Sequence, residues 1–140
     1  MPSCWARLAA AEMFTAAITA QAGDIDELGH VNNAVWVQWV ERVATDHWRA
    51  AGDPALVDAV LWVITRHEID YLKPLLEGQT VTAQTWAEGP PKGARSVRMM
   101  EFIDVDGTVH VRSRTEWAMI DRTSGRPMRV RPEMIAPFLR

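Results

Sequence analysis

The sequence has one cysteine, Cys4, among 140 residues. A single thiol cannot form an intramolecular disulfide, and it cannot supply a cysteine-based zinc site. No run of about 18 apolar residues occurs, which is the length that a transmembrane helix requires. The first residues also lack the basic start and long apolar core of a secretory signal peptide. We therefore expect a protein of the reducing cytoplasm that does not insert into a membrane.

An excess of basic charge is also missing. Fifteen Lys and Arg face eighteen Asp and Glu, giving a formal net charge of -3. Without a dominant positive field, a nucleic-acid partner is not expected. The sequence contains no glycine-rich phosphate loop and no nucleophile elbow of a serine hydrolase.

Metal-binding patterns are absent as well. The four histidines show no ligand spacing, and they are His30, His47, His67 and His110. Asp24 and Asp26 are spaced like the start of a calcium loop, but Leu28 and Val35 stand where that loop needs oxygen ligands. We expect no metal and no other cofactor.

The residues that are present predict a single α+β domain. Residues 1–12 are interpreted as an N-terminal arm, and 13–140 as one domain with one core. Polar side chains recur every three or four residues over 33–51, which predicts a long, mostly buried helix ended by A-G-D-P. Strands are predicted at 14–21, 61–72, 79–87, 96–105 and 108–120, with a P-P-K-G loop at 90–93, a hairpin turn at Asp106-Gly107 and a final helical turn in the tail. Successive strands with short links indicate an antiparallel sheet packed on the helix.

The segment before the helix, D-I-D-E-L-G-H-V-N-N, has two interpretations. Asn32 or Asn33 can cap the helix, and Asp24, Asp26 and Glu27 lie near the positive end of its dipole. The same N-terminus can instead polarise a carbonyl and hold an oxyanion, while a nearby carboxylate attacks the carbonyl carbon or deprotonates a water. The residue pattern alone leaves both open.

This segment, followed by Trp36, Trp39 and Glu41, resembles the signature of hotdog-fold thioesterases. It is similar to the 4-hydroxybenzoyl-CoA thioesterase group of acyl-CoA thioesterases and to the first half-domain of plant acyl-ACP thioesterases. I-D-Y-L-K-P-L and D-R-T-S-G-R-P extend the resemblance over roughly residues 14–132. The resemblance implies the hotdog fold, an antiparallel sheet wrapped around one long central helix. It also implies an acyl-CoA thioesterase that assembles as a homodimer or homotetramer with active sites at subunit interfaces.

The resemblance also implies roles for single residues. Asp26 matches the catalytic carboxylate, as nucleophile or general base, and the backbone N–H of Asn33 matches the oxyanion donor. His30 matches a histidine implicated in the acyl-ACP branch. The acyl-ACP network is incomplete here, because Leu28 replaces an asparagine and Pro74 a glutamate.

Substrate contacts are expected at both ends of the acyl-CoA. The candidates for an acyl pocket are Trp36, Val40, Trp62 and Ile64, which plain core packing also explains. The candidates for the CoA phosphates are Lys92, Arg95 and Arg98, which an ordinary solvated loop also explains. CoA enters as part of the substrate.

Two other functions are compatible with the same fold. A hotdog hydratase or dehydratase carries G-D-x-N-P-x-H, which Gly23-Asp24-x-Asp26 approaches. Here Asp replaces Asn, the proline is missing and His30 lies one position too far. A non-catalytic acyl-CoA or acyl-carrier binding module is the other alternative, and the presence of Asp26 speaks against it.

Overall fold

The computed structural model describes residues 13–140, so the expected arm at 1–12, with Cys4, lies outside the described residues. Five strands are present, namely β1 (Phe14–Thr19), β2 (Val60–Tyr71), β3 (Thr80–Lys92), β4 (Arg95–Ile103) and β5 (Val109–Asp121). The helices are η1 (Ala22–Asp24), α2 (Asn33–Ala51), α3 (Pro54–Ala59), α4 (Pro132–Ile135) and η2 (Ala136–Phe138).

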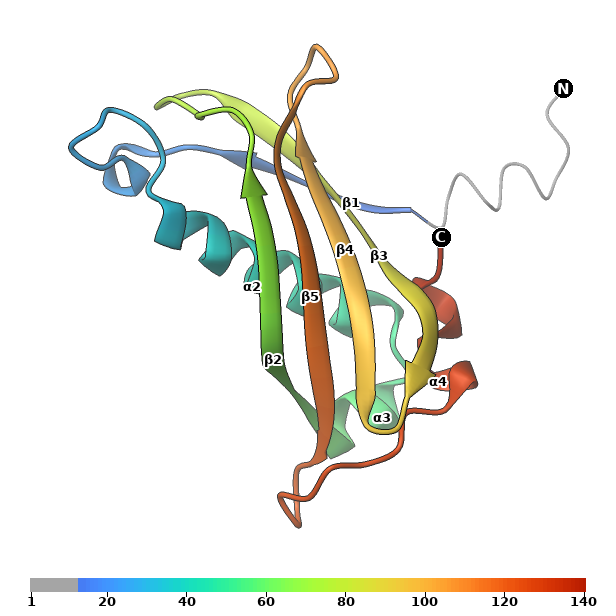
Figure 1. The fold of residues 1–140 in the computed structure, drawn as a ribbon. Helices are drawn as coiled ribbons and strands as arrows, with labels where there is room; N and C mark the ends of the chain where they lie inside the picture. The colour runs from blue at the N-terminus through green and yellow to red at the C-terminus, as the bar shows by residue number, and fades with distance from the viewer. Residues whose placement is uncertain (1–12) are drawn as a thin grey trace, which may run out of the picture.

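The strands form one antiparallel sheet in the order β1-β3-β4-β5-β2. The long helix α2 lies across one face of this sheet, and the short helices α3 and α4 gather at one end (Figure 1). The α+β class and the antiparallel sheet are therefore confirmed. The expected single helix is accompanied by shorter ones that the sequence pattern did not predict, apart from the helical turn in the tail.

Helix α2 has the predicted bounds because its ends are chemically marked. Asn32 is the N-cap, and its Oδ1 accepts a hydrogen bond from the Ala34 N–H at 2.8 Å. Gly52 is the C-cap, and Pro54 then opens α3. Between them one stripe is buried at steps of three and four residues: Trp36, Trp39, Val40, Val43, Ala44 and His47.

This stripe packs on the inward-facing residues of the sheet. The main core joins α2 to side chains of β1, β3, β4 and β5, including Ile18, Val81, Ala83, Met100, Phe102 and Val111. A second core surrounds the end of the chain, and it contains Val60, Ala87, Met119, Val130, Ile135 and Phe138. The second core closes the end of the sheet where α2 finishes.

The predicted P-P-K-G loop is wrong. Strand β3 continues through both prolines to Lys92, which pairs with Arg95 on β4. The reversal takes only Gly93 and Ala94, and Gly93 adopts a φ of +57° that favours glycine. The prolines are tolerated because the β3–β4 register is already irregular between Glu88 and Lys92.

Strand β2 forms one edge of the sheet and contains a β-bulge. Ile64 pairs with Trp117 and Arg66 with Glu116, so Thr65 is the extra residue. Before the bulge Trp62 and Ile64 face inward, and after it His67 and Ile69 do. Thr65 and Arg66, at the bulge, are both exposed.

No helix of residues 13–140 combines the length and apolar character needed to cross a membrane.

Candidate active site

The loop before α2 is a closed unit held by its own backbone. The Asp26 N–H donates to the His30 carbonyl at 3.0 Å, and the Gly29 N–H donates to the Asp26 carbonyl at 3.0 Å. Ile25 and Val31 form an antiparallel bridge across its base. Gly29 has a φ of +87°, a conformation that side chains rarely adopt. The loop therefore holds Asp26 next to the start of α2.

The Asp26 carboxylate is oriented by its own loop. Its Oδ1 accepts the Leu28 N–H at 2.9 Å, forming an Asx turn. Its Oδ2 makes no hydrogen bond with another described residue. Asp26 is partly buried and Leu28 is 74% exposed. One carboxylate oxygen is thus fixed while the other stays available for a reaction.

The start of α2, which follows the Asp26 loop in the chain, offers a backbone donor. Asn33 is the first helical residue, so its N–H has no intrahelical acceptor. The Asn33 carbonyl accepts a hydrogen bond from the Tyr71 hydroxyl at 3.3 Å, which ties the helix start to the end of β2. Burial raises the pKa of Tyr71, so this hydroxyl stays protonated and donates.

Asp24 and His30 serve the loop in different ways. Asp24 Oδ2 accepts the Gln21 N–H at 2.9 Å, and its carbonyl accepts the Asn32 N–H at 2.9 Å. These bonds hold the loop together, so Asp24 has a structural role in it. His30 contributes its backbone carbonyl to the loop, and its ring is partly buried.

The candidate acyl-pocket residues occupy two environments. Trp36 and Val40 are 2% and 1% exposed and belong to the main core, where Trp36 packs edge-on against Trp39 and Phe102. Ile64 is partly buried on β2. Trp62 lines a cavity that Trp36, Val40 and Ile64 do not line. Of these four candidates, Trp62 is the one that lines this cavity.

That cavity has a volume of about 320 Å³ and lies beside the C-terminal half of α2. Aromatic rings form much of its wall: Trp48, Trp62, Trp117 and Phe138. Trp48 packs edge-on against Trp62, with ring centroids 5.4 Å apart. At about 1.5 Å per residue, Ala44 on its wall lies about 16 Å along α2 from Asn33. Within one chain, the cavity and the Asp26 loop are at opposite ends of the helix.

Arg98 points inward to this cavity rather than outward to solvent. Its Nη1 donates to His47 Nδ1 at 2.9 Å and to Thr85 Oγ1 at 3.0 Å. Because arginine only donates, His47 accepts as a neutral ring with its proton on Nε2. Burial, and secondly the Arg98 charge, lowers the pKa of His47 to about 4. Burial also lowers the pKa of Arg98 to about 10. Arg98 therefore does not lie in the ordinary solvated loop that was the alternative explanation for it.

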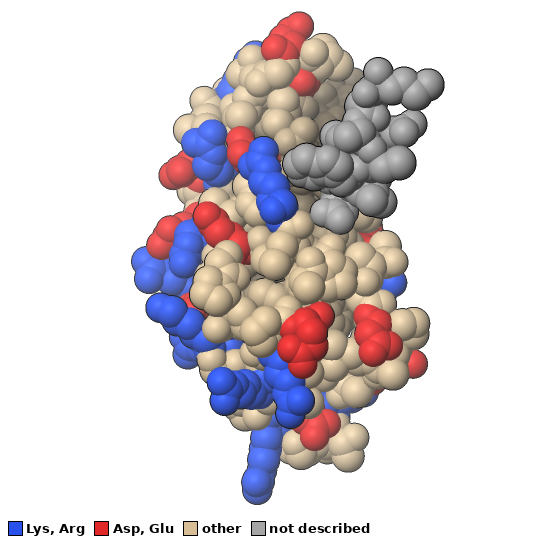
Figure 2. Space-filling model, turned by 90° about the vertical axis from the view of Figure 1, so that its right-hand side faces the viewer, with Lys and Arg blue, Asp and Glu red and all other residues tan. Residues whose placement is uncertain are grey.

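Lys92 and Arg95 remain at the surface, flanking the β3–β4 turn. Arg95 Nη1 lies 3.4 Å from Glu116 Oε2. Figure 2 shows Lys and Arg side chains gathered in the lower part of the molecule, at the height where Figure 1 places this turn and the tail after β5. Acidic side chains lie among these basic ones, so this part of the surface is not uniformly positive.

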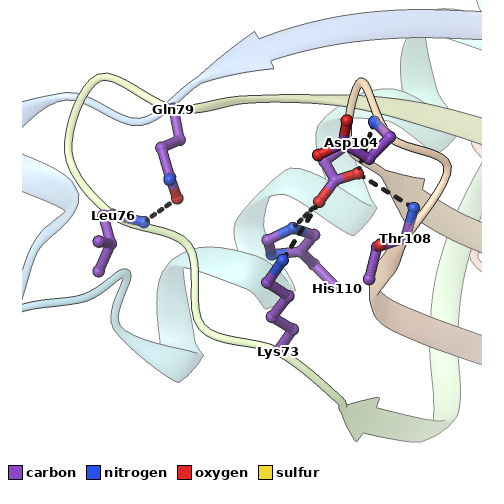
Figure 3. A network of polar contacts seen from close by, with 7 residues as sticks. Lys73, Leu76, Gln79, Asp104, Thr108 and His110 are labelled. Carbon is purple, nitrogen blue, oxygen red and sulfur yellow. Dashed lines mark hydrogen bonds and ion pairs between the residues drawn. The ribbon is translucent and has the colours of Figure 1, made fainter.

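A carboxylate–histidine pair lies at the β4–β5 hairpin (Figure 3). Asp104 accepts hydrogen bonds from His110 Nε2 at 2.9 Å and from the Thr108 N–H at 3.0 Å, with Lys73 Nζ at 3.6 Å. The His110 bond is the main cause that lowers the pKa of Asp104 to about 2. The His110 carbonyl accepts the Leu72 and Lys73 N–H groups. The pair thus anchors the segment after β2, whose Leu75 carbonyl accepts the Val31 N–H of the Asp26 loop.

Comparison with known proteins decides the family. A sequence model of the Thioesterase-like superfamily matches residues 20–138. The chain belongs to the Thioesterase-like superfamily. This confirms the resemblance, and it supports the expected enzyme class, a thioester hydrolase. A search of curated proteins finds no match.

Solved structures of thioesterases share the fold of this superfamily member. A predicted thioesterase from Bacillus stearothermophilus has 25% identity and a TM-score of 0.77, covering 91% of this chain and 97% of its own. A DHNA-CoA thioesterase from Staphylococcus aureus has 21% identity and a TM-score of 0.73, covering 84% and 80%. Another Staphylococcus aureus protein, solved in complex with CoA, has 17% identity and a TM-score of 0.77, covering 89% and 79%.

Two inward-facing polar groups of this superfamily member were missed from the sequence. His47 falls on the buried stripe of α2, three residues after Ala44, rather than on the polar stripe. Arg98 alternates with Met100 and Phe102 and therefore shares their face of β4. Both inward positions follow from the spacing of residues along α2 and β4. Arg98 was nevertheless expected near the surface, because charged residues beside a turn are usually solvated. His110 on β5 is also buried, at 2% exposed, and its ring bonds Asp104 in the hairpin loop.

Proposed function

We propose that this protein is an acyl-CoA thioesterase whose reaction takes place at the Asp26 loop and the start of α2. The observation that carries the proposal is the oriented Asp26 carboxylate, with Oδ1 held by the Leu28 N–H, immediately before the N-terminus of a 19-residue helix. Family membership supplies the reaction class. The proposed overall arrangement is the hotdog, with the sheet curved around α2.

In the proposed reaction the thioester carbonyl oxygen is held by the Asn33 N–H. The partial positive charge of the helix N-terminus stabilises the negative charge that develops on this oxygen. His30 sits in the same loop and is the candidate for a further polar contact to the substrate. No group other than the protein's own is required for these steps.

Asp26 can open the thioester by two routes. As a nucleophile, Oδ2 bonds to the carbonyl carbon, the C–S bond breaks, CoA leaves as a thiolate, and water then hydrolyses the mixed anhydride. As a general base, Asp26 takes a proton from a water whose oxygen bonds to the same carbon, and the C–S bond then breaks so that CoA leaves as a thiolate. After a single turnover in ¹⁸O-water, label in the Asp26 carboxylate would establish the anhydride route, because only water attack on the aspartyl carbonyl of the anhydride places it there.

Lys92 and Arg95 are the candidates for the CoA phosphates, since both are exposed cations at one turn. Trp62 is the candidate for the acyl group. Trp36, Val40 and Ile64 are the weaker candidates, because the first two are enclosed in the core of the single chain.

A homodimer would reconcile the distant positions of the cavity and the Asp26 loop. Strand β2 is an edge strand whose free side can pair with a second copy. In a two-fold antiparallel pairing along β2, the start of one strand lies beside the end of the other. Trp62 would then lie near the partner's helix start, because Tyr71 at the other end of β2 bonds Asn33.

The test is thiol release from short, long and aryl acyl-CoAs, followed for wild type and for Asp26→Asn. We expect multiple turnovers in wild type and a loss of at least about 100-fold in kcat for the variant, in line with removal of a catalytic base or nucleophile. Asp46→Asn, on the exposed side of α2, is the matched control. Near-normal turnover by a folded Asp26→Asn protein would remove Asp26 from the mechanism.

A further inference from the structure

The cavity beside the C-terminal half of α2 has a cationic lining. Its charged wall residues are Arg49, Arg98, Arg122 and Asp58, three guanidinium groups against one carboxylate. The neighbouring His47 adds no charge, because it accepts from Arg98 as a neutral ring. An anion entering this cavity would therefore meet net positive charge.

Arg98 lies in the cavity and still has donors to offer. Its Nη1 is used by His47 and Thr85, and its guanidinium lies 5.7 Å from the centre of the Phe138 ring. None of the described carboxylates forms an ion pair with it. Its Nε and Nη2 make no hydrogen bond with a described residue. A shielded guanidinium without a carboxylate is costly, and an anionic ligand would offset that cost.

The remaining wall selects for an organic anion. Trp48, Trp62 and Phe138 present apolar rings to the cavity, and Trp48 contacts both of the others. Burying an apolar body against these rings releases free energy, because apolar surface is removed from water. A fully hydrated inorganic anion has no apolar surface to bury there. The guanidinium suits the planar geometry of a carboxylate.

We propose that this cavity binds a small organic carboxylate, with its carboxylate on Arg98 and its apolar body against the aromatic wall. Two sources share this chemistry. One is the far carboxylate of a dicarboxylic acyl group in the thioester substrate, and the other is a free carboxylic acid, such as the hydrolysis product. The first source depends on the proposed function, and the second can be tested without any turnover.

The binding test uses octanoate, followed by the fluorescence of the cavity tryptophans. We expect saturable binding of octanoate, and binding at least about tenfold weaker for 1-octanol, which lacks the charge. Arg98→Met should lose at least about tenfold in octanoate affinity, while Arg112→Met, on the exposed outer side of β5, should bind like wild type. Val57→Phe, which fills the cavity from α3 and keeps Arg98, should also lose binding, and it serves if Arg98→Met does not fold.

The outcomes separate the two sources and can overturn the proposal. A drop of at least about tenfold in kcat/KM of Arg98→Met on octanedioyl-CoA but not on octanoyl-CoA identifies the substrate's far carboxylate. If Arg98→Met turns over both thioesters as wild type does, but octanoate no longer inhibits it, the natural ligand of the site is the free acid. If neither thioester turns over but octanoate still requires Arg98, the proposed function fails and the site stands. Three results would refute the site. Octanoate and 1-octanol would bind with equal affinity, or inorganic phosphate would displace a bound probe as well as octanoate does. The third result is unchanged octanoate binding in a folded Arg98→Met protein.

Discussion

Replacing Asn33 with proline removes one proton from the proposed oxyanion site and nearly nothing else. Asn33 is the first residue of α2, where proline is favoured because the N–H has no intrahelical acceptor. The preceding Asn32 has φ -61° and ψ 138°, an extended conformation that proline allows. The Asn33 carbonyl, which receives the Tyr71 hydroxyl, is kept.

The expected changes in stability and catalysis have opposite signs. A compatible proline stabilises by about 0.4–1 kcal/mol through the unfolded chain. For 140 residues, with an unfolding entropy of about 2.1 cal/mol/K per residue, this raises Tm by about 1–3 °C. Loss of one oxyanion donor lowers kcat by about 100- to 1,000-fold.

The assay compares Asn33→Pro with Asn33→Ala, which keeps the backbone N–H. Thiol release gives kcat and KM at 25 °C, and calorimetry gives Tm for each protein. A proline variant that melts no lower than the alanine variant but turns over at least about 100-fold more slowly supports the donor role. A proline variant of equal Tm and equal kcat refutes it, and catalysis then uses another group.

Three further outcomes are expected. Asn32→Ala removes the acceptor of the Ala34 N–H and should lower the free energy of unfolding by about 1 kcal/mol, measured by urea titration. Asn32→Asp keeps an acceptor and should be as stable as wild type. Equal losses of stability in the two variants would disprove the cap. Because the pKa of Asp104 is lowered to about 2, its stabilising effect is present above its ordinary pKa near 4 and is lost as pH falls through 2. Asp104→Asn should therefore be less stable than wild type at pH 7, and its stability should vary less with pH between about 4 and 2; parallel pH profiles would contradict this. Trp36→Ala, which empties a side chain that is 2% exposed, should cost about 3–5 kcal/mol in chemical denaturation, and a cost below about 1 kcal/mol would show that the core collapses around it.

The elements with strong local signals were predictable from sequence. Helix α2 has a polar stripe, an asparagine cap and a Gly-x-Pro ending, and its bounds are as predicted. The Asp106-Gly107 turn is also as predicted, with Gly107 at a φ of +83°. The β3–β4 connection was mistaken because two prolines normally end a strand, whereas here an irregular register keeps them in the sheet. The short helix α3 was missed because six residues carry too little periodicity.

The candidate site also has a part that was predictable from local sequence and a part that was not. The Asp26 loop is local in sequence, so its residues were identified together, and the structure brings them together through bonds of short span. The cavity is not local, because it joins α2, α3, β2, β3, β4, β5 and the tail. The partner of Arg98, His47, lies 51 positions away, and no spacing rule connects them. Such contacts follow only from the register of the sheet on the helix.

The bulge at Thr65 stands at the middle of β2, which runs from Val60 to Tyr71. If two copies pair symmetrically along the whole strand, their two-fold axis passes beside the bulge, and the irregular residues of both chains face each other. A bulge bends its strand and interrupts the row of backbone groups that an added strand would use. A symmetric pair would have to accommodate both bulges at its centre, and the same interruption makes the edge a poor template for the open-ended strand addition that leads to aggregation.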